Sequence, residues 1–211
     1  MLVVPRRVRR ILEDGNTKVE NPILPLAEFR DKAAYVLLGE PGSGKSLAFE
    51  EEAKATDGRF ISISKFLSDD PDPRWPRKSL YLDGLDETRA GGGEVSILLK
   101  LRAHLRKLGN PAFRIACRAA DWFGSTDSQA IGDASPDARL DILLLEPLST
   151  AEIQDILRNN HGITDPESFV EKAGKHGIDG LLNNPQTLLL MAESIREGQW
   201  PNTRQETYQL A

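Results

Sequence analysis

The segment from Gly39 to Ser46 constrains this chain more than any other feature of its sequence. It reads GEPGSGKS and fits the pattern G-x-x-x-x-G-K-[ST], a glycine-rich loop that holds phosphate groups. Glycines let the backbone curl so that successive N–H groups converge on a phosphate, and the start of a following helix adds positive potential. The apolar run before the loop predicts a strand and 47–54 predicts a helix, which is the context that the motif requires. The candidate phosphate-binding residues are Gly39, Glu40, Pro41, Gly42, Ser43, Gly44, Lys45, Ser46 and Leu47.

Two residues of this loop have specific expected roles. Lys45 would place its ammonium group near the β- and γ-phosphates of a nucleotide, and Ser46 would offer its hydroxyl to Mg²⁺. The expected ligands are therefore ATP or ADP together with Mg²⁺. The alternative interpretation is a glycine-rich turn that carries an ordinary surface lysine.

Five short apolar runs alternate with helical or loop segments over the first two-thirds of the chain. Each run is apolar along its whole length, which is typical of strands covered on both faces, as in a parallel sheet between helices. Leucines at three- and four-residue steps over 98–108 predict an amphipathic crossover helix. We therefore predict an α/β domain with a five-stranded, mostly parallel sheet flanked by helices. The apolar runs are 34–38, 59–63, 79–83, 113–117 and 140–145.

The pattern changes after Pro147, and the rest of the chain is predicted to be helical. Ser149 and Glu152 have the spacing of a capping box, which marks the start of a helix. We therefore divide the chain into an N-terminal arm and linker (1–30), a P-loop nucleotide-binding domain (31–147) and a truncated helical subdomain (148–211). Further helix starts are predicted at Pro166, Pro185 and Thr203, the last of them only a few residues before Ala211.

Acidic residues lie at the end of the third apolar run. Asp83 closes the predicted strand, and Asp86 and Glu87 follow shortly after it. A carboxylate at the end of this strand can hold Mg²⁺ beside the phosphate loop, directly or through water, so Ser46 and Asp83 are the predicted metal ligands. Either Asp86 or Glu87 could orient or deprotonate the water that attacks the γ-phosphate, and the sequence does not divide the two roles.

The segment Asp83-Gly84-Leu85-Asp86-Glu87 resembles the acidic motif of NACHT-type NTPases, which belong to the STAND class of signalling ATPases. In that motif a small residue follows the magnesium-binding aspartate, and two more acidic residues come soon after. The resemblance implies a core sheet like that of AAA+ ATPases, with the phosphate-loop strand central and the acidic strand not its immediate neighbour. It also implies a nucleotide-dependent switch that is closed with ADP, and that opens and self-associates when a sensor domain detects a ligand.

The same resemblance implies roles for Arg118 and Pro185. Arg118 ends the fourth apolar run, where family members carry a polar or basic sensor of the γ-phosphate; the alternative is an arginine that caps the strand and pairs with Asp121. A guanidinium at this place could stabilise charge on the transferred phosphoryl group. Pro185 matches a proline that packs near the nucleotide base, although a proline there also starts a helix in any case. The resemblance further implies a winged-helix domain and a sensor region, so we expect this chain to be the ATPase end of a larger protein.

Composition and charge exclude several other classes of protein. Hydrophobic residues make up 39% of the chain, which is enough for a core, but no apolar run approaches the roughly 20 residues of a membrane helix. The formal net charge is −5, so no overall basic field indicates nucleic acid as a partner. The single cysteine, Cys117, cannot form an internal disulfide, which favours a cytoplasmic location, and it is expected to be a small buried residue rather than a nucleophile.

We therefore expect Mg²⁺-dependent binding of ATP and its slow hydrolysis to ADP and phosphate, coupled to a conformational switch in signalling or defence. The expected catalytic residues are Lys45, Asp86, Glu87 and Arg118. One alternative is a P-loop kinase that acts on a small molecule, although the acidic pair favours activation of water. Another is a non-hydrolysing scaffold in which bound nucleotide only holds two domains together.

Overall fold

The computed structural model describes residues 3–11, 21–70, 72–90, 94–196 and 200. Contacts divide the chain into two compact units, a larger one of Arg6–Pro41 and Lys45–Glu146 and a smaller one of Met1–Pro5, Gly42–Gly44 and Pro147–Ala211. The strands and helices of the larger unit are β1 (Arg7–Ile11), β2 (Ile23–Pro25), η1 (Leu26–Phe29), β3 (Ala34–Gly39), α1 (Lys45–Ala55), β4 (Arg59–Ser62), α2 (Ile63–Ser68), η2 (Trp75–Arg77), β5 (Leu80–Asp83), α3 (Leu85–Ala90), α4 (Glu94–Lys107), β6 (Phe113–Arg118), η3 (Ala119–Asp121), α5 (Ser125–Gly132) and β7 (Asp141–Leu145).

The larger unit is built on one seven-stranded sheet with the order β2-β1-β7-β3-β6-β5-β4. The five strands from β7 to β4 run parallel to their neighbours, whereas β1 is antiparallel to both β2 and β7. β6 lies between β3, which leads into the phosphate loop, and β5, which ends in Asp83; this is the arrangement that the family resemblance implied. Gly39 at the end of β3 is in register with Arg118 at the end of β6, so the carboxyl ends of β3, β6 and β5 meet at one edge of the sheet.

The predicted number of strands is wrong, because the sheet has two strands more than the five expected. All five predicted strands are present and parallel, and the two additional strands, β1 and β2, come from the first 30 residues. β1 has no apolar run that would predict a strand, because only Val8 of it is buried. Its Arg10 forms an ion pair with Asp141, the first residue of β7, and its Arg9 with Glu146, the residue after β7. The strand pairs through its backbone with the distant β7 and with β2, and hydrophobic periodicity does not reveal such pairing.

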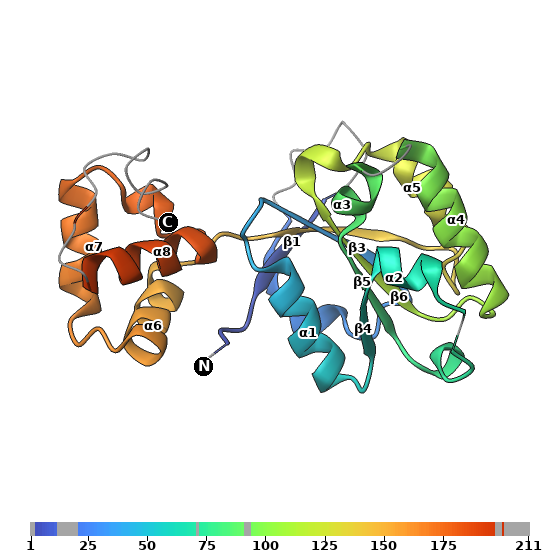
Figure 1. The fold of residues 1–211 in the computed structure, drawn as a ribbon, viewed down its shortest axis with the longest axis horizontal. Helices are drawn as coiled ribbons and strands as arrows, with labels where there is room; N and C mark the ends of the chain where they lie inside the picture. Colours follow the sequence, from blue (N-terminus) through green and yellow to red (C-terminus); the bar gives the residue numbers. More distant parts are fainter. Residues whose placement is uncertain (1–2, 12–20, 71, 91–93, 197–199, 201–211) are drawn as a thin grey trace. The chain divides into compact units, whose positions relative to one another are not determined.

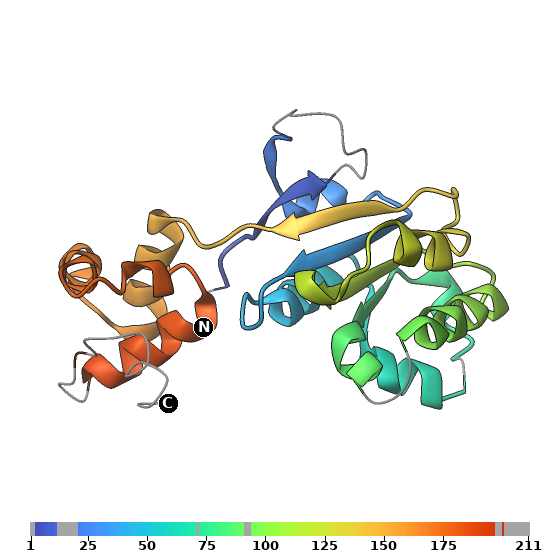
Figure 2. The ribbon, with the colours of Figure 1, turned by 90° about the horizontal axis from the view of Figure 1, so that it is seen from above.

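Helices cover both faces of the sheet. Along β3, Val36 and Leu38 pack in one buried cluster with residues of α2, α4 and α5, whereas Tyr35 and Leu37 pack in another with residues of α1 and η1. This alternation follows from strand geometry, which sends successive side chains to opposite faces. The amphipathic crossover helix predicted over 98–108 is confirmed as α4, which lies side by side with α5 (Figures 1 and 2). β3, which leads into the phosphate loop, is thus buried by helices on both faces of the sheet.

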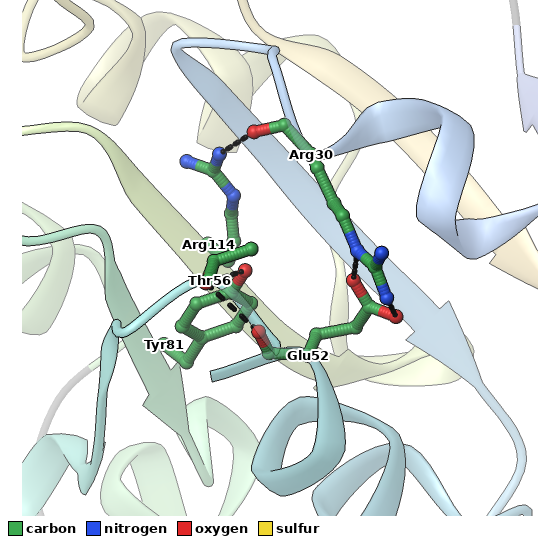
Figure 3. A network of polar contacts seen from close by, with 5 residues as sticks. All are labelled: Arg30, Glu52, Thr56, Tyr81 and Arg114. Carbon is green, nitrogen blue, oxygen red and sulfur yellow. Dashed lines mark hydrogen bonds and ion pairs between the residues drawn. The ribbon is translucent and has the colours of Figure 1, made fainter. Parts of the chain in front are cut away.

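A buried polar network fixes the far end of α1 against the sheet (Figure 3). Arg114 of β6 is 1% exposed, and its guanidinium donates to the carbonyl oxygens of Arg30 (2.8 Å), Ala33 (3.2 Å) and Phe113 (3.3 Å). It also lies over the rings of two tyrosines on β3 and β5. Two further contacts lie at this end of α1: a bidentate pair from Arg30 to Glu52 of the helix, and a 3.1 Å hydrogen bond between the hydroxyls of Tyr81 and Thr56, the residue after the helix.

The smaller unit contains the helices α6 (Thr150–His161), α7 (Pro166–Lys175) and α8 (Pro185–Arg196), with η4 (Asp179–Leu181) between the last two. The capping box predicted at Ser149 and Glu152 is confirmed at the start of α6. Leu157, Phe169 and Leu188, one from each helix, are buried together in a core of this unit's own. The helix start predicted at Thr203 lies outside the described residues. Within the described part of the chain, no helix has the length and apolar character needed to cross a membrane.

Candidate functional site

The phosphate loop connects a buried strand to the start of a helix. All six residues of β3 are buried, and α1 begins at Lys45, directly after the loop. Gly42 and Gly44 have φ angles of +70° and +88°, in the left-handed region that side chains rarely adopt. The two glycines are therefore required by the backbone path that brings the chain from β3 into α1 within a few residues.

The Lys45 side chain folds back along this loop. Its Nζ atom donates hydrogen bonds to the carbonyl oxygens of Gly39 and Glu40, both at 2.9 Å. Burial lowers the pKa of Lys45 from its usual value, and the negative charges of Asp86 and Asp83 partly offset this effect. The charges of both carboxylates therefore act on the ammonium group, and the role of Lys45 and Asp83 at a nucleotide stays a prediction.

Gly84 makes the turn that leads from β5 into α3. It has a φ of +79°, and the Thr88 N–H and hydroxyl both donate to its carbonyl oxygen. The Glu87 carboxylate lies over this turn, because a Cβ atom added to Gly84 would be 3.3 Å from Glu87 Oε2. Glu87 is exposed, and within the described residues it makes no hydrogen bond and no ion pair. A carboxylate on the first turn of α3 is therefore open to solvent beside the strand end.

Asp86 and Arg118 form an ion pair between α3 and the end of β6. Arg118 Nε lies 2.7 Å from Asp86 Oδ2, and the Arg118 backbone N–H donates to Asp86 Oδ1 at 3.3 Å. The Asp86 side chain is 10% exposed and that of Arg118 is 47% exposed. The pairing of Arg118 with Asp121 that the sequence left open is not formed within the described residues; its partner is Asp86 instead.

The residues predicted to bind Mg²⁺ offer suitable ligand atoms. Asp83 supplies a half-buried carboxylate and Ser46 a hydroxyl, and neither side chain makes a hydrogen bond or ion pair within the described residues. The described part of the chain contains no group of three or more His, Cys, Asp or Glu side chains that could hold a metal ion. Mg²⁺ commonly binds through one or two protein oxygens, with phosphate oxygens and water completing its shell, so this donor set fits the ion.

Two other residues singled out in the sequence lie in different surroundings. Pro185 is the first residue of α8 in the smaller unit, so its contact with a nucleotide base stays a prediction. Cys117 is buried in β6, and burial raises the pKa of its thiol to about 12. The thiol is therefore protonated at neutral pH, which agrees with a packing role.

A buried ion pair between Arg89 of α3 and Asp127 of α5 was not predicted from the sequence. Nothing in the local sequence marks it, because its two members are far apart along the chain and an arginine on a short helix resembles any surface residue. The one available signal is that Arg89 follows two positions after Glu87, on the same helix.

A cavity of about 410 Å³ lies elsewhere, along β4, α2 and the segment after them. Its walls are mostly charged side chains, and none of its lining residues is among the predicted site residues. The candidate site is therefore an open edge of the sheet rather than this cavity.

Comparisons with known proteins find matches among solved structures only. No family model matches this chain, and no curated protein does. Among solved structures, the chain matches a signal transduction ATPase with numerous domains (STAND) that carries a tetratricopeptide repeat sensor, from Pyrococcus horikoshii. The two are 14% identical with a TM-score of 0.48, and the match covers 88% of this chain and 31% of the other, so this chain spans less than a third of that protein's length.

Proposed function

We propose that this chain binds Mg²⁺–ATP where β3, β6 and β5 end, and that it hydrolyses ATP slowly to ADP and phosphate. The observation that carries the proposal is the position of Lys45, whose ammonium group lies on the Gly39 and Glu40 carbonyl oxygens and near the carboxylates of Asp83 and Asp86. A cation at the start of a helix, next to glycines with left-handed backbone, suits the phosphates of a nucleotide.

Lys45 is the main phosphate-binding side chain in this proposal. Its present partners are two neutral carbonyl oxygens, and anionic phosphate oxygens would form stronger, charge-assisted hydrogen bonds with the same ammonium group. Backbone N–H groups of the loop and the first turn of α1 would bind the same phosphates. Asp83 and Ser46 would hold Mg²⁺, which neutralises charge on the β- and γ-phosphates when it is bound.

The contacts of Asp86 and Glu87 support a division of their roles. Asp86 accepts from both the backbone N–H and the Nε of Arg118, so its carboxylate is already occupied. Glu87 is exposed beside the end of β5 with no such partner within the described residues. We therefore assign to Glu87 the orientation of the attacking water and acceptance of its proton, and to Asp86 the placement of Arg118.

Arg118 is the candidate for contact with the γ-phosphate. Its Nε is held by Asp86, and almost half of its side chain is exposed at the edge where β3 and β6 end. A guanidinium held in this way presents its remaining N–H groups to an anion with little loss of side-chain freedom. We propose that it stabilises the charge that develops on the transferred phosphoryl group.

We further propose a wider role, which rests on the resemblance of the segment 83–87 to the NACHT acidic motif. In this wider role, the chain would be the nucleotide-driven switch of a larger, self-associating STAND-type protein in the cytoplasm. Pro185 would pack near the base of the nucleotide. ATP and ADP would differ in the contacts that they make with Arg118 and Lys45, and such a difference is what allows a nucleotide to shift a conformational equilibrium.

A pair of lysine variants on α1 tests nucleotide binding directly. Lys45→Ala is expected to weaken Mg²⁺–ATP binding by about a hundredfold or more, since each hydrogen bond to a charged group contributes about 1.5–3 kcal/mol. Lys54→Ala is the matched control, because Lys54 is on the same helix but is exposed and, among the described residues, forms an ion pair with Glu51 alone. Both affinities can be measured by titration calorimetry. Tight binding of ATP by Lys45→Ala would contradict the proposed site.

A further inference from the structure

α3 carries the proposed water-activating residue, and it is only one and a half turns long. It spans Leu85–Ala90, with Asp86 and Glu87 in its first turn. A helix this short is not stable by itself, so its orientation depends on what its side chains bind. The Asp86–Arg118 pair holds its first turn to the end of β6. A fixed orientation of the whole helix requires a second attachment, at its last turn.

The last turn of α3 is held by Arg89, which is almost completely buried. Arg89 Nη2 lies 2.8 Å from Asp127 Oδ1, and the two side chains are 5% and 2% exposed. Arg89 Nη1 donates to the backbone carbonyl oxygen of Asp121, and the guanidinium lies 5.2 Å from the centre of the Phe123 ring. Arg89 thus contacts three points of the segment that follows β6.

Asp127 is itself held in place by the same segment. Its second carboxylate oxygen, Oδ2, accepts a hydrogen bond of 2.9 Å from the Phe123 backbone N–H. The Asp127 carboxylate is thus fixed next to the Arg89 guanidinium, and the two form a close ion pair in which Arg89 Nη2 makes no hydrogen bond. α3 is connected at both of its ends to the chain from Arg118 to Asp127, first through Asp86 and then through Arg89.

Stability alone does not explain a buried ion pair in this place. Removing two charges from water offsets most of their attraction, so an apolar pair of similar size is often equally stable or more so. What an ion pair supplies beyond packing is a fixed orientation. On a helix, residues two positions apart face different directions, so Arg89 can point into the core while Glu87 remains exposed at the site.

We propose that Arg89 and Asp127 are positioning residues, which hold α3 so that the Glu87 carboxylate can orient the attacking water. This inference rests on the proposed hydrolysis of ATP. It adds that the catalytic geometry depends on a buried contact to α5, and that ATP binding does not. Loss of the pair is therefore expected to lower kcat and to leave the affinity for Mg²⁺–ATP unchanged.

The test removes both charges together, because a charge left in the core without a polar partner could unfold the chain. In Arg89→Met/Asp127→Leu, kcat is expected to fall by about tenfold to a hundredfold, since small displacements of a catalytic group have effects of this size. Its Kd for Mg²⁺–ATP should stay within about twofold. Adding this double change to Glu87→Gln should cause no further loss beyond that of Glu87→Gln alone, because both changes act on the same step.

A milder variant and a matched control accompany this measurement. Asp127→Asn keeps the acceptor for the Phe123 N–H and almost the same volume but removes the charge, so it should lower kcat in the same direction. Arg30→Met/Glu52→Leu removes an ion pair elsewhere in the same unit and leaves the backbone carbonyl of Arg30, which binds Arg114, intact (Figure 3). This control should keep both kcat and Kd.

Two results would overturn this inference and leave the proposed hydrolysis standing. One is a wild-type kcat in both Arg89→Met/Asp127→Leu and Asp127→Asn. The other is an equal loss of kcat and of ATP affinity that the Arg30→Met/Glu52→Leu control also shows. Absence of phosphate release from the wild-type chain would instead overturn the proposed hydrolysis, and this inference with it. The wild-type measurement thus distinguishes the two failures.

Discussion

At the scale of single residues, Lys45 is the group whose chemistry depends most on its surroundings. Its ammonium is partly buried at the start of α1, and burial lowers its pKa. Asp86 and Asp83 raise the pKa again but do not cancel the effect of burial. The lysine therefore loses its proton at a lower pH than an exposed lysine does.

This environment predicts how ATP binding depends on pH. Bound phosphate favours the protonated ammonium, so binding raises the pKa of Lys45, and the affinity falls as pH rises through the lowered pKa of the free chain. The decline should begin below pH 10.5, the usual value for lysine. Asp86→Asn removes the larger of the two carboxylate contributions and should move the decline to lower pH, measured by titration of ATP at several pH values. A midpoint that moves upward would contradict this account.

Gly84 is the residue that places the Glu87 carboxylate. Gly84→Ala puts a side chain at a φ of +79° and within 3.3 Å of Glu87 Oε2, so it should strain the turn and displace that carboxylate. We expect a loss of about 1–2 kcal/mol in the free energy of unfolding, together with slower turnover. Gly132→Ala is the control, because a Cβ there meets no atom within 4 Å and the backbone of Gly132 is not left-handed. Equal stability of Gly84→Ala and wild type would show that the turn is not strained by a side chain.

At the scale of elements, α1 is held at its two ends by different chemistry. Its start carries Lys45 and follows the loop glycines. At its other end, Glu52 pairs with Arg30, and Thr56, the residue after the helix, bonds to Tyr81 of the sheet (Figure 3). Arg114 completes this arrangement beneath the helix, because it joins the backbone before β3 to the sheet. The helix that begins at the phosphate loop is thus anchored far from it.

Arg114→Met tests the structural importance of this anchor. The variant removes the Arg114 donor from three carbonyl oxygens, of which that of Ala33 keeps the Phe113 backbone N–H, and it is expected to lower the free energy of unfolding by about 3 kcal/mol in urea denaturation. Arg74→Met is the control, since Arg74 is exposed and its loss should leave stability unchanged. A stability equal to wild type in Arg114→Met would mean that the carbonyl groups find water or other partners.

Local sequence patterns predicted the elements that depend on local physics. The apolar runs gave the five parallel strands, and the capping spacing at Ser149 gave the start of α6. The phosphate loop and the acidic strand end were also evident from their residues, because their chemistry is set by short spacings. β1 and the Arg89–Asp127 pair were not, since both depend on contacts between segments that meet only in the folded chain. The proposed division of roles between Asp86 and Glu87 likewise rests on the position of Arg118.

At the scale of the whole molecule, the chain has separate cores in its two units. The larger unit buries its apolar residues on both faces of the sheet, and the smaller one buries Leu157, Phe169 and Leu188 among its own helices. Cores that share no residues can unfold with different free energies.

This separation predicts the effect of Leu157→Ala, which removes a side chain that is 0% exposed. The variant should destabilise the smaller unit by about 2–5 kcal/mol. Hydrogen exchange should then become faster in α6 and α8, while amides of β3 and β6 keep their protection. Equally faster exchange in all four elements would mean that the two units unfold together.

The most direct test of the central claim compares phosphate release from ATP by the wild-type chain and by Glu87→Gln, with Mg²⁺ present and no acceptor substrate added. We predict that the wild-type chain releases phosphate slowly, and that Glu87→Gln binds ATP with similar affinity but turns over about 10²–10⁴-fold more slowly, the usual contribution of a general base. Equal turnover by the two proteins, or no phosphate release by the wild-type chain, would contradict hydrolysis at this site.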